Sequence, residues 1–233
     1  MTSAPLPRRR ATLTLAGLIA LASMIVVLAA VGTRESHAAG DHAHGAAPVA
    51  TLTAKAVRFH DAMRALWEIH GTYTERAIVD AVAGNPDTNA VVARLLQNQL
   101  DIGNAVKPYY GNAGGAALTK LLKTHINTAV ATVLAAKSGN AAATQKAKAA
   151  FYANGKQVAS FLHKANPKFW SLPAMQTMMR VHLNQVVALA VDQINGQYGA
   201  AIKLYDQYIN HILVGMADML SNGIIEQFPN RFQ

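Results

Sequence analysis

The stretch Leu66-Trp67-Glu68-Ile69-His70 decides the fold, because two similar stretches follow it at a spacing near 56 residues. They are Leu121-Leu122-Lys123-Thr124-His125 and Met178-Met179-Arg180-Val181-His182. An apolar residue also precedes each histidine by seven positions, so the apolar residues and the histidine share one face of an α-helix. The repeat therefore predicts three helices, each with a histidine on its apolar face.

A second landmark follows each of these histidines. Asn98, Asn154 and Asn210 come 28, 29 and 28 residues after them. The midpoints are strong turn or helix-stop dipeptides, namely Gly84-Asn85, Gly139-Asn140 and Asn195-Gly196. Each repeat is therefore predicted to be a helical hairpin in which the histidine and the asparagine lie at the same height and can touch.

Proline-containing segments at residues 108–115 and 166–173 are predicted to separate the hairpins, because proline removes a backbone donor and disfavours helix before itself. The expected fold class is all-α, an up-down helical bundle of about six helices built from three repeated helical hairpins. The expected helices lie near residues 50–83, 87–106, 116–138, 141–165, 174–195 and 198–227.

The N-terminus has the pattern of a targeting segment. Arg8-Arg9-Arg10 precedes an uncharged run over residues 11–31, and Ser36-His37-Ala38 offers a cleavage site. Residues 1–38 are therefore predicted to be a signal peptide or a membrane anchor, since the run is also long enough to span a bilayer. The protein is expected to be exported, and to be periplasmic, extracellular or anchored to the cytoplasmic membrane by residues 11–31.

Residues 39–49 are small and polar and are predicted to form a flexible linker before a helical-bundle domain over residues 50–233. His42 and His44 lie in this linker and are candidate ligands for Cu(II), Ni(II) or Zn(II). A solvated spacer is the simpler interpretation of the same residues.

The histidines on the helix faces are the main candidate site. His70, His125 and His182 should lie at one level in the bundle, and three neutral imidazoles suit Zn(II) or Cu(II). Asp101 and Asp206 lie within one turn of the asparagines Asn98 and Asn210, so they are candidates to join or orient a metal or a small ligand. The alternative is structural: each histidine would simply bond to Asn98, Asn154 or Asn210.

Catalytic signatures are missing from the sequence. There is no cysteine, which excludes disulfides, Cys-ligated zinc or iron–sulfur sites and a thiol nucleophile. There is no Gly-x-Ser-x-Gly motif and no Glu-x-x-His motif. The sequence therefore predicts an exported binding protein with a His/Asn-lined interior, and an enzymatic activity finds no support in it.

The charge pattern suggests a second function. The formal net charge is +9, and no acidic residue occurs between Asp101 and Asp192. An alternative prediction is therefore a structural or envelope-associated protein that docks on an anionic surface, with inert core histidines and no nucleic acid expected as partner. The lysines that would carry this contact are Lys107, Lys120, Lys123, Lys137, Lys146, Lys148 and Lys156.

Several segments resemble a little-characterised family of exported bacterial all-helical proteins. They are His70-Gly-Thr-Tyr-Thr-Glu-Arg76, Leu95-Leu-Gln-Asn-Gln-Leu-Asp-Ile-Gly103, Pro108-Tyr-Tyr-Gly111 and Met216-Ala-Asp-Met-Leu-Ser-Asn-Gly-Ile-Ile-Glu-Gln-Phe-Pro229. The resemblance spans roughly residues 60–230, although the family usually has Trp where Tyr73 stands, and it implies no mechanism or site residues. Its members are often labelled glycosyltransferase. The sequence pattern of this chain predicts no α/β nucleotide-sugar domain, and the chain has no Asp-x-Asp motif.

Overall fold

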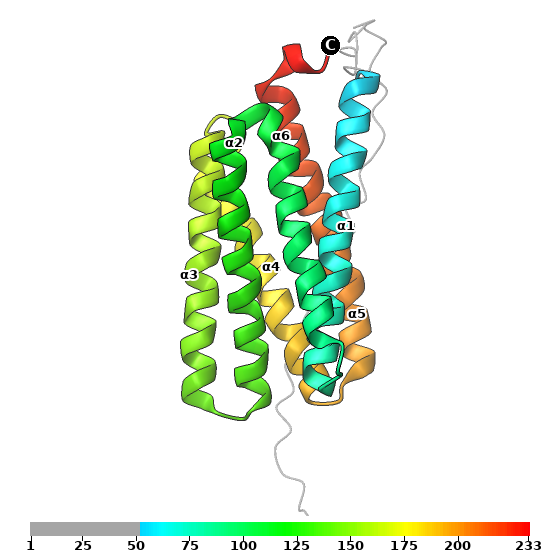
Figure 1. The fold of residues 1–233 in the computed structure, drawn as a ribbon, viewed down its shortest axis with the longest axis vertical. Helices are drawn as coiled ribbons and strands as arrows, with labels where there is room; N and C mark the ends of the chain where they lie inside the picture. Colours follow the sequence, from blue (N-terminus) through cyan, green and yellow to red (C-terminus); the bar gives the residue numbers. More distant parts are fainter. Residues whose placement is uncertain (1–51) are drawn as a thin grey trace, which may run out of the picture. The chain divides into compact units, whose positions relative to one another are not determined.

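The computed structural model describes residues 52–233, which contain helices and no strand (Figure 1). The all-α prediction is therefore confirmed for this part of the chain. The elements are α1 (Ala54–Ala83), α2 (Thr88–Lys137), α3 (Ala141–Ala165), α4 (Leu172–Ile194), α5 (Tyr198–Asn210), the π-helical segment η1 (His211–Asp218), α6 (Met219–Gln227) and the 3₁₀ turn η2 (Pro229–Arg231). The predictions for the leader, the linker, His42 and His44 lie outside the described residues.

The predicted set of six separate helices differs from these elements in two places. Residues 108–115, expected as a loop, lie inside α2, which continues through Pro108 and changes direction at Gly111. The φ and ψ of Gly111 are 73° and 173°, a conformation that only glycine adopts readily. The final helix is also divided, because η1 separates α5 from α6.

The two arms of α2 run in opposite directions from this bend (Figure 1). They touch through backbone, since a Cβ atom built on Gly103 would lie 2.7 Å from the carbonyl oxygen of Gly115. One glycine conformation thus reverses the chain where the sequence predicts a loop of eight residues.

The helix ends coincide with the predicted turn dipeptides. Gly84 follows α1 in the left-handed conformation, with φ 77°, and its N–H donates to the carbonyl of Asp80 at 2.8 Å. Side-chain oxygens cap the starts of three helices: Thr53 accepts from Ala56, Asn140 from Ala143 and Ser171 from Ala174. These local signals fix where α1, α3 and α4 begin and where the chain reverses.

The helices pack around a large apolar core, and Ala77, Val91, Leu95 and Ile126 form a second, smaller apolar cluster. α1 contacts α2, α4 and η1, α2 contacts α3, and α3 contacts α4, so the interior is enclosed by elements from the whole described chain (Figure 1). Toward the C-terminal end, Trp170 is buried where a Cβ atom on Gly223 would lie 2.0 Å from its Nε1. The indole N–H there donates to the carbonyl of Met219 at 3.3 Å.

Within residues 52–233, no helix has the length and apolar character needed to cross a membrane.

Candidate functional site

The three predicted histidines lie together in the core. The exposed fractions of His70, His125 and His182 are 2%, 3% and 1%, although they come from α1, α2 and α4. The ring centroids of His125 and His182 are 5.5 Å apart, and those of His70 and His182 are 5.9 Å apart. We call these three side chains the histidine layer.

Hydrogen-bond directions assign the proton of His125. The amide nitrogen of Asn154 donates to the Leu121 carbonyl at 3.2 Å, which turns its Oδ1 toward His125 Nδ1 at 2.9 Å. Because Oδ1 only accepts, His125 must carry its proton on Nδ1. Its Nε2 is then an acceptor, and it faces His182 Nε2 at 3.4 Å. The predicted pair of His125 and Asn154 is therefore present.

His182 is left with an unpaired nitrogen. Since its Nε2 must donate to His125, its Nδ1 carries a lone pair, and this buried atom has no hydrogen-bond partner. The Tyr208 ring stacks on His182 at a centroid distance of 5.7 Å. The buried hydroxyls of Tyr208 and Thr74 have no other partner than one another. Few buried polar atoms in folded proteins lack a partner, so the unpaired Nδ1 of His182 is unusual.

His70 has a different partner from the one predicted. Its Nδ1 faces Gln99 Nε2 at 3.2 Å, whereas the amide of Asn98 donates to the Leu66 carbonyl at 2.9 Å. Gln99 comes 29 residues after His70, the same spacing that joins His125 to Asn154. That shared spacing was the signal in the sequence that could have identified Gln99.

The third predicted pair does not form. Asn210 is exposed at the end of α5, while Tyr208 and Ile212 are buried. The residue 29 positions after His182 is His211, whose Nε2 donates to the Met178 carbonyl at 3.3 Å. Asn154 makes the corresponding bond to the carbonyl four residues before its histidine, so His211 takes the place expected for Asn210.

The two predicted carboxylates lie outside the histidine layer. Asp206 is exposed on α5, and Asp101 accepts from Gln97 at 3.0 Å and pairs with Arg94 at 3.7 Å. Within residues 52–233, no group of three or more His, Cys, Asp or Glu side chains has the arrangement of a metal site. The three imidazoles therefore do not themselves form a three-ligand group, and no carboxylate lines the cavity beside them.

Burial keeps the layer neutral. Desolvation lowers the pKa of His70 to about 3 and that of His125 to about 4 from an ordinary 6.5, and nearby histidines add to the effect at His70. The pKa of His182 is also well below 6.5, first because of burial and then because of the neighbouring imidazoles. At neutral pH all three rings are therefore uncharged, which is the form that binds metals.

A small cavity of about 30 Å³ adjoins the histidine layer. All three histidines line it, together with mainly apolar side chains that include the thioethers of Met63, Met179 and Met216. A volume of this size holds one or two water molecules, or an ion, and excludes larger organic ligands.

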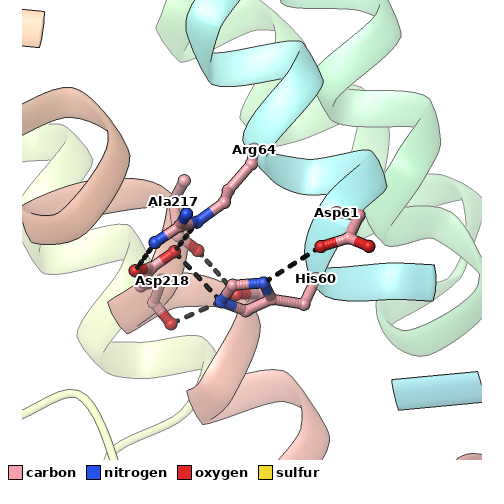
Figure 2. A network of polar contacts seen from close by, with 6 residues as sticks. His60, Asp61, Arg64, Ala217 and Asp218 are labelled. Carbon is pink, nitrogen blue, oxygen red and sulfur yellow. Dashed lines mark hydrogen bonds and ion pairs between the residues drawn. The ribbon is translucent and has the colours of Figure 1, made fainter. Parts of the chain in front are cut away.

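A second polar cluster joins α1 to η1 nearer the surface (Figure 2). Arg64 Nε donates to Asp218 Oδ1 at 2.6 Å, and His60 Nε2 lies 3.0 Å from the same oxygen. The bond from Arg64 holds the pKa of Asp218 below its usual 3.8. Because Arg64 and His60 of α1 both bind Asp218 of η1, this cluster fastens η1 to α1.

The predicted lysine surface has no acidic counterpart. Ion pairs within residues 52–233 involve arginines and histidines, and none involves a lysine. Lys137 makes a hydrogen bond, since its Nζ donates to the Ala81 carbonyl at 3.0 Å near the end of α1. The other predicted lysines, Lys107, Lys120, Lys123, Lys146, Lys148 and Lys156, are half-buried or exposed.

Comparisons with family models, curated proteins and solved structures give no match to this chain. The resemblance to exported bacterial helical proteins therefore stays a prediction, and function has to be argued from the site.

Proposed function

We propose that the protein binds a metal ion at the histidine layer, with His125 and His182 as the first two ligands. The observation that carries this proposal is the 3.4 Å separation of their Nε2 atoms. Two imidazole nitrogens bound to one tetrahedral metal at 2.0–2.1 Å lie about 3.3–3.4 Å apart. The pair is thus already spaced as metal ligands.

The hydrogen bonds around the pair suit this role. Asn154 holds the proton of His125 on Nδ1 and leaves Nε2 free, as an outer-shell partner of a metal ligand does. His182 would bind through Nε2 once its proton moves to Nδ1, the nitrogen that has no other partner. His70 lines the same cavity and is the candidate third ligand, although its contact with Gln99 would first have to rearrange.

The surroundings favour Cu(I) over Zn(II). No carboxylate lines the cavity beside the histidine layer, so a doubly charged ion would be buried there without compensation. Cu(I) carries a single charge and accepts thioether sulfur beside imidazole. Met63, Met179 and Met216 line the cavity and offer such sulfurs.

The test is a competition titration of the full chain against a chromophoric Cu(I) chelator, repeated with Zn(II). We expect one equivalent of Cu(I) to bind, and we expect His125→Gln or His182→Gln to weaken binding at least 100-fold. The double variant His42→Gln/His44→Gln is the matched control, because it removes the linker histidines and should bind as the wild type does. Binding that is lost in this control, or absent in the wild type, would refute the histidine layer as the site.

A further inference from the structure

A surface groove lies between α3 and α4, and it shares Met179 with the cavity beside the histidine layer. Its volume is about 500 Å³, within the range of small-molecule sites. Gly155 allows the two helices to approach, since a Cβ atom there would lie 2.9 Å from Leu183 Cδ2. Met179 and Leu183 are buried residues of α4 that line the groove and give it an apolar floor.

The rim of the groove is cationic. Lys156 and Arg180 line it, are exposed and take part in no ion pair of the described residues. Lys148 adds a third positive charge, because its Nζ lies 5.8 Å from the centroid of the Tyr152 ring, which also lines the groove. α3 contains no acidic residue, and the only one in α4 is Asp192, twelve residues beyond Arg180. The groove therefore attracts anions without a competing carboxylate.

Hydrogen-bonding side chains complete the lining. Gln176 and Thr177 are exposed on the first turns of α4 and face the same groove as the two cations. The hydroxyl of Tyr152 donates to Asn184 at 2.6 Å, which fixes its ring at the side of the groove. A ligand that complements the apolar floor, the cationic rim and the hydrogen-bonding side chains has an anionic head with several acceptor oxygens and an apolar continuation.

We infer that this groove binds the phosphate headgroup of an anionic phospholipid. The phosphate would lie at the rim by Lys156 and Arg180, and the glycerol with its first methylenes would contact Met179 and Leu183. The groove is too small for the acyl chains, so they remain in the bilayer and the protein docks on the membrane surface. Cations near an anionic membrane each strengthen binding about five-fold, so the two cations of the rim would together strengthen it about 30-fold.

The first test uses soluble short-chain lipids, so that adsorption to a bilayer does not contribute. Isothermal titration with dihexanoyl-phosphatidylglycerol should show saturable binding at one site, and dihexanoyl-phosphatidylcholine should bind at least ten-fold more weakly. Equal binding of the two lipids, or no binding of the first, would overturn the inference. Displacement of the lipid by millimolar inorganic phosphate alone would also overturn it, because the ligand would then be a free anion.

The second test uses vesicles with and without phosphatidylglycerol and two variants of equal charge change. Lys156→Gln/Arg180→Gln should weaken binding to the anionic vesicles about 30-fold, as expected from two lost cations. Lys120→Gln/Lys146→Gln removes the same charge away from the groove and should cost less than three-fold. Equal losses in the two variants would show that diffuse charge, and not the groove, drives binding. Circular dichroism of both variants checks that they fold.

Discussion

The position of the proton on each imidazole decides which ring nitrogens of the histidine layer are free to bind a ligand. The carbonyl of Leu121 orients Asn154, Asn154 orients His125, and His125 in turn orients His182. The chain of bonds ends at His182 Nδ1, which has no partner. A network that is satisfied at one end and open at the other is a poor way to stabilise a core, and it is a suitable way to prepare a ligand.

Asn154→Leu tests the first hydrogen bonds of this network. The change keeps the approximate volume but removes the acceptor for the His125 proton, so we expect a loss of about 1–3 kcal/mol in the free energy of unfolding. Urea unfolding measures it. Asn104→Leu on the exposed face of α2 is the control and should change stability by less than about 0.5 kcal/mol. Similar values for the two variants would contradict a buried hydrogen bond at Asn154.

The residue-level predictions from the sequence were partly right for a geometric reason. Helical periodicity placed His70, His125 and His182 on apolar faces, and the structure buries all three. The hydrogen-bond partners of the histidines were harder to predict, because the turn midpoints fix the position along the neighbouring helix only to about one residue. A shift of one residue rotates a side chain by about 100° around the helix axis. The prediction therefore chose Asn98 and Asn210 where the structure uses their neighbours Gln99 and His211.

At the scale of helices, the main surprises come from packing that leaves little trace in the sequence. Pro108 and Gly111 suggested a loop, yet Pro108 stays in α2 and Gly111 alone reverses the chain. The π-helical segment η1 widens the last helix between α5 and α6. A π segment depends on how buried residues such as Ile212 and Met216 meet the core, and it has no residue signature comparable to a turn dipeptide.

Gly111→Ala tests the bend. No atom lies within 4 Å of a Cβ built there, so the cost comes from the backbone conformation and should be about 1–3 kcal/mol. Gly199→Ala is the matched control, because it also has open space but an ordinary helical conformation, and it should be neutral or stabilising by up to about 1 kcal/mol. Thermal and urea unfolding compare the two. A neutral Gly111→Ala would show that the bend needs no glycine.

For the whole molecule, burying neutral histidines makes stability depend on pH. The unfolded chain binds protons near the ordinary pKa of 6.5, whereas folded His70 and His125 bind them only near pH 3 and 4. The unfolded state therefore holds more protons between these values, and stability falls as pH decreases through this window. The pKa values of His182 and His211 are lowered as well, and they act in the same direction.

We expect the free energy of unfolding to decrease from pH 6.5 toward pH 4 by up to about 1.4 kcal/mol per pH unit for each buried histidine. Urea unfolding at several pH values measures this slope. Asp218 does not account for such a slope, because its pKa is held below 3.8 and its contribution to stability is lost only below this pH window. His182→Gln should reduce the slope. A stability that stays constant between pH 6.5 and 4 would contradict the burial of neutral histidines.

The central claim is that His125 and His182 bind one metal ion through Nε2, and histidine ¹⁵N NMR of the full chain tests it most directly. Long-range ¹H–¹⁵N spectra of the metal-free protein should show the proton of His125 on Nδ1 and that of His182 on Nε2. One equivalent of Cu(I), which is diamagnetic, should then move the Nε2 signals of these two residues to metal-bound values and shift the His182 proton to Nδ1. The signals of His60, which pairs with Asp218, and of His163, whose Nδ1 donates to the Trp170 carbonyl, should stay unchanged. Spectra in which only histidines outside the layer respond, or in which nothing changes, would contradict the claim.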